Sequence, residues 1–150
     1  MLRVASPVAG HSLEVSDIPD PVFAQGIVGP GIALRPRPGR QVAVAPVTGR
    51  LVKLLPHAYV VVTAGGEAVL THLGIDTVHL QGEGFDLLAM EGDDVTTGYP
   101  VVAWDPALVE AAGHSAVCAV LVLDCDESDV HQCVADANVA SGDCVLEVRC

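Results

Sequence analysis

The segment that decides the fold spans residues 56–76 and reads PHAYVVVTAGGEAVLTHLGID. It contains two runs of aliphatic and β-branched residues, 59–63 and 68–73, on either side of the loop 64–67, which includes two glycines. Two such runs separated by a short glycine-containing loop are typical of a β-hairpin. We therefore expect these runs to pair as neighbouring antiparallel strands.

The rest of the chain has the same strand-and-turn composition. It contains 26 valines but only five aromatic residues, and 15 glycines and 10 prolines interrupt it. Further strands are predicted at residues 42–45, 50–54, 100–104, 117–123 and 144–148. A short helix is expected after Asp105, which would cap it, with Pro106 at its first position and Gly113 at its end. Residues 1–150 are thus predicted to form a single all-β domain, a β-sandwich or barrel-sandwich with one or two short helices.

The charge balance excludes several classes of partner. The net charge is −12, from 7 Lys and Arg against 19 Asp and Glu, so nucleic acid is not expected as a partner and basic partner surfaces are favoured. No apolar run approaches the roughly 20 residues of a membrane-spanning helix. The N-terminal residues also lack the apolar core of a signal peptide. We expect a cytoplasmic protein that meets the membrane only indirectly.

The cysteines all lie in the last third of the chain, at Cys118, Cys125, Cys133, Cys144 and Cys150. No two of them have the C-x-x-C spacing of a zinc knuckle or a redox dithiol. The cysteines have two possible roles. His131 and Cys133 could form a thiolate or metal site, or the cysteines could serve as small apolar side chains within strands. The second role is favoured, because free cysteines are often buried. The cysteines are therefore not expected to form a metal site.

The histidines fall into two groups. His11, His79, His114 and His131 lie in polar or turn-like contexts and are predicted to be surface residues. His57 and His72 instead lie at or within the two apolar runs of the predicted hairpin. Pairing of the two strands would bring both imidazoles to one patch, which makes them candidates for chemistry.

Two kinds of chemistry fit such a pair of histidines. A neutral imidazole is a nucleophile when its other nitrogen is held as a donor, and a second imidazole can donate to the oxygens of a phosphoryl group on the first. Alternatively, Asp76 lies four residues after His72, so two histidines and a carboxylate could form a zinc site. The residues alone leave both possibilities open.

Several ordered motifs resemble a known family. The principal one is residues 71–78, THLGIDTV, followed by GEGF at 82–85; IPDPVF at 18–23, VAPVTG at 44–49 and PHA at 56–58 precede them. With this order, between about residues 6 and 105, the chain resembles the glucose-type IIA component of the bacterial phosphoenolpyruvate-dependent sugar phosphotransferase system. That resemblance implies a β-sandwich whose shallow apolar face carries both histidines.

The resemblance also implies a function and a set of site residues. His72 would accept a phosphoryl group from the phosphocarrier HPr and pass it to a cysteine on the IIB domain of a sugar permease, while His57 would stabilise the phosphohistidine. No cofactor is implied, because the phosphoryl group comes from phosphoenolpyruvate through enzyme I and HPr. The implied partner-binding residues are the acidic Asp20 and Asp76, and an apolar ring of Val22, Phe23, Ile27, Leu70 and Val78.

The chain departs from the family pattern near both histidines. Leu55 and Pro56 stand where many members have a threonine, Thr71 replaces an apolar residue, and Leu70 replaces an aromatic one. Two other functions are alternatives to that of a phosphocarrier. One is a zinc-dependent hydrolase of the lysostaphin type using His57, His72 and Asp76, although no H-x-H pair is present. The other is a non-catalytic regulatory protein that binds its targets through the same face.

Overall fold

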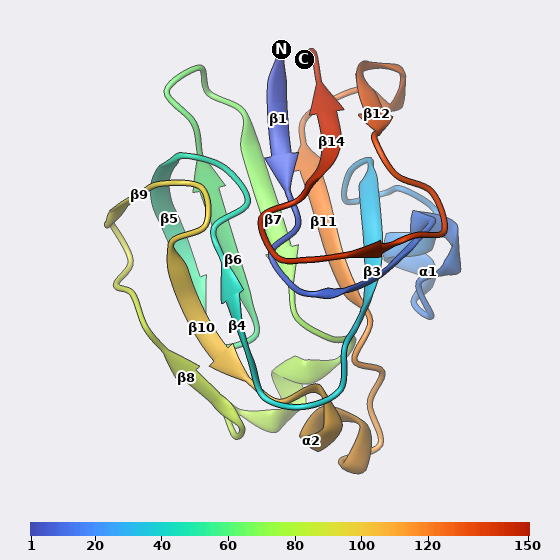
Figure 1. Cartoon of the computed structure of the whole chain (residues 1–150), viewed down its shortest axis with the longest axis vertical. Helices are drawn as coiled ribbons and strands as arrows, with labels where there is room; N and C mark the ends of the chain where they lie inside the picture. The colour runs from blue at the N-terminus through green and yellow to red at the C-terminus, as the bar shows by residue number, and fades with distance from the viewer.

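The predicted hairpin lies within an eight-stranded antiparallel sheet in the computed structural model, which describes all 150 residues. The strand order is β13-β2-β3-β11-β7-β6-β5-β9. The bounds of these strands are β2 (Gly10–Leu13), β3 (Gly31–Pro36), β5 (Gly49–Leu55), β6 (Ala58–Val62), β7 (Ala68–His72), β9 (Asp94–Val95), β11 (Cys118–Leu123) and β13 (Asn138–Val139). Figure 1 shows the sheet curling behind the rest of the chain.

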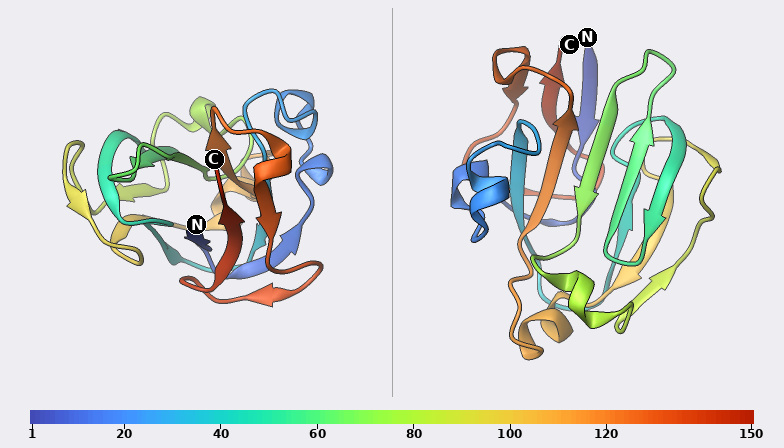
Figure 2. Two further views of the ribbon diagram at one scale, coloured as in Figure 1. Left: turned by 90° about the horizontal axis from the view of Figure 1, so that it is seen from above. Right: turned by 180° about the vertical axis from the view of Figure 1, so that it is seen from behind.

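Two three-stranded sheets complete the sandwich. One has the order β1 (Leu2–Ala5), β14 (Cys144–Val148), β12 (Val130–Gln132), and the other β4 (Gln41–Val44), β10 (Pro100–Trp104), β8 (Phe85–Leu87). The view from above in Figure 2 shows that the three sheets nearly close around the interior. A core cluster of 26 buried residues fills this space and draws on all three sheets, with Val4, Trp104 and Val120 among its fully buried members.

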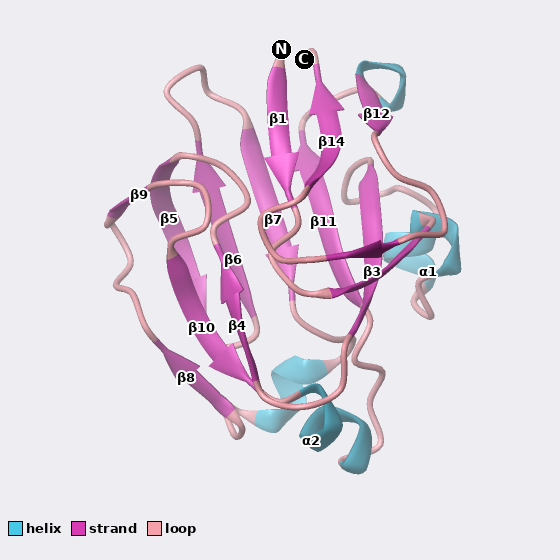
Figure 3. Ribbon diagram, in the orientation of Figure 1, coloured by secondary structure: helices cyan, strands magenta, loops and turns pink.

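The helices are few and short, as Figure 3 shows. The two α-helices are α1 (Pro21–Ala24) and α2 (Pro106–Ala111), and three 3-10 helices cover Val15–Asp17, Thr77–Leu80 and Glu127–Asp129. Both α-helices begin with an Asp-Pro pair: Asp20 accepts from the amide of Val22, and Asp105 accepts from that of Ala107. None of these helices combines the length and the apolar character that crossing a bilayer requires.

The all-β fold class and the helix after Asp105 are confirmed. Every predicted strand is present with ends that differ by no more than one residue. The strands that sequence analysis missed are two to six residues long, and most lack an alternating pattern: β1, β2, β3, β8, β9, β12 and β13. β3 starts at Gly31, where a Cβ atom would come within 1.9 Å of the Val120 carbonyl oxygen. A glycine in this strand permits close approach to β11 rather than marking a turn.

Tyr59 ties the large sheet to one of the small ones. Its side chain, on β6, is fully buried, and its hydroxyl donates to the carbonyl oxygen of Val44 at 2.7 Å, at the end of β4. Burial raises the pKa of the Tyr59 phenol, so the hydroxyl keeps its proton. This hydrogen bond satisfies a carbonyl that the core would otherwise leave without a partner.

Replacing Tyr59 by phenylalanine tests this connection. Tyr59→Phe removes the donor and leaves the Val44 carbonyl unpaired, which should lower the free energy of unfolding by about 1–2 kcal/mol. Urea denaturation followed by circular dichroism measures the change. Tyr99→Phe is the matched control, because Tyr99 is exposed. Equal stability of the two variants would contradict this account.

Candidate functional site

The register of the β6–β7 hairpin brings His57 and His72 together. Ala58 pairs with His72, and the Leu73 amide donates to the His57 carbonyl oxygen at 2.7 Å. The two imidazole centroids are 5.2 Å apart, with an angle of 70° between the ring planes. The convergence predicted from the hairpin is therefore present.

The orientation of His72 is set by a hydrogen bond to the next turn. Its Nδ1 lies 2.6 Å from the carbonyl oxygen of Gly74, and because a carbonyl can only accept, Nδ1 carries the proton. Nε2 is then the unprotonated nitrogen and has no hydrogen-bond partner in the chain. Gly74 has a φ of +77°, and a Cβ atom there would come within 2.6 Å of the Thr77 side chain. Glycine is needed to present this carbonyl.

The surroundings of both rings favour the neutral imidazole. Burial lowers the pKa of His72, against the opposing effects of the Gly74 carbonyl and the charges of Asp20 and Asp76. Burial also lowers the pKa of His57, and the neighbouring His72 adds to this effect. At neutral pH, His72 thus presents an unprotonated Nε2, the form in which imidazole is nucleophilic.

An apolar surface surrounds His72 on the outer face of the large sheet. The Phe23 ring centroid lies 5.2 Å from that of His72. Phe23 and Leu70 pack on a small cluster that is separate from the main core and consists of Ile18, Ala33, Ile75, Ala119 and Leu121. Val22, next to Phe23 in sequence, stays 47% exposed, and Ile27 and Val78 stay 68% and 56% exposed.

The remaining residues singled out in the sequence take defined positions. Asp20 caps α1, and Asp76 follows β7 with a φ of +59°; both are close enough to act on the charge of His72. His57, His72 and Asp76 do not form a metal site, since the structure gathers no group of three His, Cys, Asp or Glu side chains suited to a metal ion. The zinc-dependent alternative is therefore not favoured.

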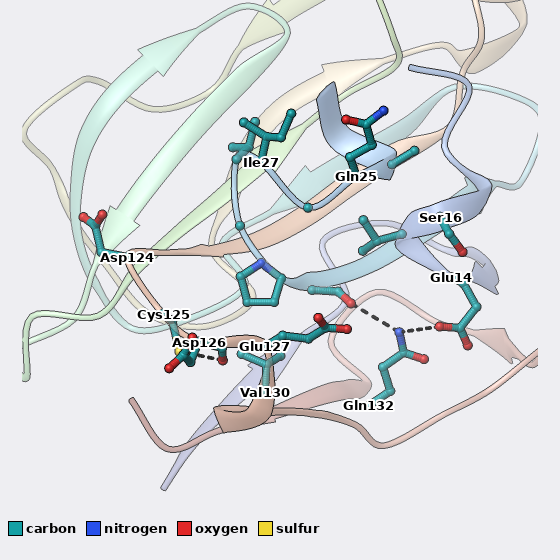
Figure 4. A pocket seen from close by; sticks show the side chains of 17 residues that line it. Glu14, Ser16, Gln25, Ile27, Asp124, Cys125, Asp126, Glu127, Val130 and Gln132 are labelled. Carbon is teal, nitrogen blue, oxygen red and sulfur yellow. Dashed lines mark hydrogen bonds between the residues drawn. The ribbon is translucent and has the colours of Figure 1, made fainter. Parts of the chain in front are cut away.

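Sequence analysis missed a polar cleft beside this surface. The cleft has a volume of about 730 Å³ and lies between the segment around Ile27 and the loop that follows β11 (Figure 4). Glu14, Asp126 and Glu127 contribute carboxylates, and Gln132 Nε2 donates to the Gly31 carbonyl oxygen at 3.2 Å. His72 is not among its lining residues. The segments that form the cleft are about 100 residues apart in sequence, so no local sequence pattern predicts the cleft.

Three of the four histidines predicted to lie at the surface have partners: His11, His79 and His114. His11 Nε2 lies 2.6 Å from Asp136 Oδ1, and its Nδ1 lies 2.8 Å from Asn138 Oδ1. These bonds raise the pKa of His11, the one to Asp136 more than the one to Asn138. The rings of His79 and His114 stack with centroids 6.2 Å apart. Each pair joins separate elements, which is why sequence spacing did not reveal it.

The titration order of the histidines tests the electrostatics of the site. Because burial lowers the pKa of His57 and His72, both should take up a proton at a lower pH than His11 does. Long-range ¹H–¹⁵N spectra recorded from pH 8 to pH 5 measure this order directly. The same spectra should show His72 protonated at Nδ1 near neutral pH. A proton on Nε2, or titration of His72 above His11, would contradict the geometry described.

Comparisons with known proteins point to one family. The family model described as phosphoenolpyruvate-dependent sugar phosphotransferase system, EIIA 1, matches residues 2–128. The chain is 37% identical over 145 residues to the "PTS system glucose-specific EIIA component" of Halalkalibacterium halodurans, which covers 95% of this chain and 83% of the relative. It is 33% identical over 129 residues to the protein of the same name from Staphylococcus aureus, with coverage of 85% and 76%.

A solved structure agrees with the fold as well. The glucose permease IIA from Mycoplasma capricolum superposes with a TM-score of 0.85 at 28% sequence identity, and the match covers 97% of this chain and 94% of that one. Family match, relatives and fold all point to one phosphocarrier family. The chain belongs to the EIIA 1 family of the phosphoenolpyruvate-dependent sugar phosphotransferase system.

Proposed function

We propose that His72 carries the phosphoryl group in this phosphocarrier, taking it from HPr and passing it to a cysteine of a IIB domain. The observation that carries the proposal is the hydrogen bond from His72 Nδ1 to the Gly74 carbonyl, which leaves Nε2 unprotonated. In the transfer, Nε2 would form a bond to phosphorus as the bond to the histidine of HPr breaks. Positive charge that develops on the imidazole is shared through Nδ1–H with the Gly74 carbonyl.

His57 is proposed to stabilise the phosphohistidine. Its ring stands at 70° to that of His72 at a centroid distance of 5.2 Å, so a ring N–H can donate to a phosphoryl oxygen on Nε2. The burial of the two rings supports this role, because a hydrogen bond to an anion is strong where water is excluded. The second transfer, to IIB, requires the phosphoryl group to be held in place and should therefore depend most on His57.

The surface around His72 is proposed to dock both partners in turn. The apolar residues Val22, Phe23, Ile27, Leu70 and Val78 would exclude water from the N–P bond and contact HPr or IIB. Asp20 and Asp76 would face positive charge on those partners, in keeping with the net charge of −12. We propose that the protein works in the cytoplasm without a cofactor and reaches the membrane through the permease. No observation favours a purely regulatory binding role over this one.

Substitution of the two histidines separates their roles. His72→Gln should abolish uptake of phosphate from phospho-HPr, because the nucleophilic nitrogen is gone. His57→Gln should still be phosphorylated but should pass the group to IIB more slowly, by about 100-fold or more if the hydrogen bond is worth ~3 kcal/mol in the transition state. Intact-mass spectrometry after incubation with phosphoenolpyruvate, enzyme I and HPr measures the first step. His131→Gln is the control, because His131 is exposed on β12. Phosphate uptake by His72→Gln would refute the assignment.

Neutralising the two carboxylates tests the docking surface. Asparagine can still cap α1 at position 20 and tolerates the positive φ at position 76, so both variants should fold. Asp20→Asn and Asp76→Asn should each raise the KM for phospho-HPr by about fivefold at low ionic strength and leave kcat nearly unchanged. The effect should shrink as salt is added.

Asp94→Asn is the matched control for these two variants. It removes the same charge at β9, on the edge of the sheet away from His72. If Asp94→Asn raised the KM as much as the other two, overall charge rather than this surface would govern docking.

A further inference from the structure

The C-terminal region brings two cysteines together that are distant from the phosphoryl-transfer site. Cys133 follows β12, and Cys144 begins β14. Their Sγ atoms are 3.4 Å apart, and the Cys133 amide donates to the Val145 carbonyl oxygen at 2.9 Å, which holds the two segments side by side. A disulfide joins sulfurs at about 2.05 Å. The two thiols therefore need to approach by little more than an ångström to form one.

The surroundings of Cys133 keep its thiol protonated. Partial desolvation, followed by the neighbouring Cys144 and the carboxylate of Glu147, raises the pKa of this thiol to about 12. Glu147 Oε1 lies 3.7 Å from Cys133 Sγ. A thiol with this raised pKa is almost entirely protonated at neutral pH, so we expect its exchange with a small disulfide to be slow there and faster at alkaline pH.

We propose that Cys133 and Cys144 are a redox-active dithiol that forms a reversible disulfide on exposure to a low-molecular-weight disulfide. Cys133 is exposed and Cys144 is half-buried, so Cys133 would attack first. Its sulfur bonds to one sulfur of the small disulfide and expels the other as a thiol. Cys144 then attacks the Cys133 sulfur and releases the second small thiol. The protein loses two protons and two electrons, and the small disulfide gains them.

The bridge would close the loop that carries β13. Residues 134–143 lie between the two cysteines, and within them β13 pairs with β2 at the edge of the large sheet (Figure 1). Asp136 and Asn138 of the same loop bond to His11. A covalent bridge across this loop restricts the conformations of the unfolded chain. It also stabilises β13, an edge strand that pairs with β2 through only two residue pairs. This proposal does not depend on phosphoryl transfer.

The test uses the full chain with the competing cysteines removed. Cys125 and Cys150 neighbour each other, so both are replaced in Cys125→Ser/Cys150→Ser, while Cys118 stays buried in β11. After incubation with oxidised glutathione, denaturation and N-ethylmaleimide treatment, intact mass should show one label, on Cys118, and a loss of two hydrogens. Addition of Cys133→Ser should remove the bridge. Three labels, on Cys118, Cys133 and Cys144, would overturn the proposal.

The unmodified chain provides two further readouts. Cleavage before aspartate places Cys133 in residues 129–135 and Cys144 in residues 143–150, so a bridge appears as these two peptides joined. Fragmentation must assign the bond to Cys144; a bond from Cys133 to Cys125 or Cys150 instead would overturn the assignment. The oxidised protein should also melt about 5 °C higher than the reduced one, and a reductant should reverse this. A bridged protein that melts no higher would contradict the fastening of β13.

Discussion

The register of the β6–β7 hairpin determines where the functional face lies. Ala58 pairs with His72 and Val61 with Val69, so Val61, Val69 and Thr71 point into the core while Leu70 and His72 point outward. Because side chains alternate along a strand, a slip of one residue would bury His72 and expose the valines. The register is therefore held by the burial of the valine-rich inner face, and the position of the site follows from it.

His72 combines two demands that oppose each other. Nucleophilicity requires a neutral ring, which burial among apolar side chains favours. The proposed docking of basic partners would require negative charge nearby, which Asp20 and Asp76 could supply, and their charges raise the pKa of the same ring. The net shift is downward, so desolvation outweighs the two carboxylates. In the proposed transfer, the Gly74 carbonyl would accept from Nδ1 both before and after Nε2 receives the phosphoryl group.

The C-terminal third is organised differently from the hairpin. β14 pairs with β1 on one side and β12 on the other, so the two ends of the chain lie side by side, as Figure 1 shows. Val139 is the one buried residue of the loop between β12 and β14, and the partly buried Val134 also packs against the core. Polar contacts to His11 and the neighbouring cysteines take the place of apolar packing there. A polar cleft opens beside this region, between the loop that follows β11 and the segment around Ile27.

What the sequence determined by itself is the hairpin, the other strands rich in valine and the helix at Asp105, because each depends on local patterns of apolar, glycine and proline residues. It also indicated that His57 and His72 converge, since a short loop leaves the two strands little choice of pairing. The Asp-Pro pair at position 20 carried the same signal as Asp105 and could have identified α1. The motifs around His72 added the family.

Only the tertiary structure decided the rest. Strands of two to four residues, such as β9 and β13, are specified by their partners across the sheet rather than by their own composition. The contact between Cys133 and Cys144 and the bonds of His11 to residues over 120 positions away arise only when the curled sheet brings separate segments together. The proton on His72 Nδ1 depends on a contact of 2.6 Å with Gly74, which the positive φ of that glycine sets. Sequence spacing carries no information on such contacts.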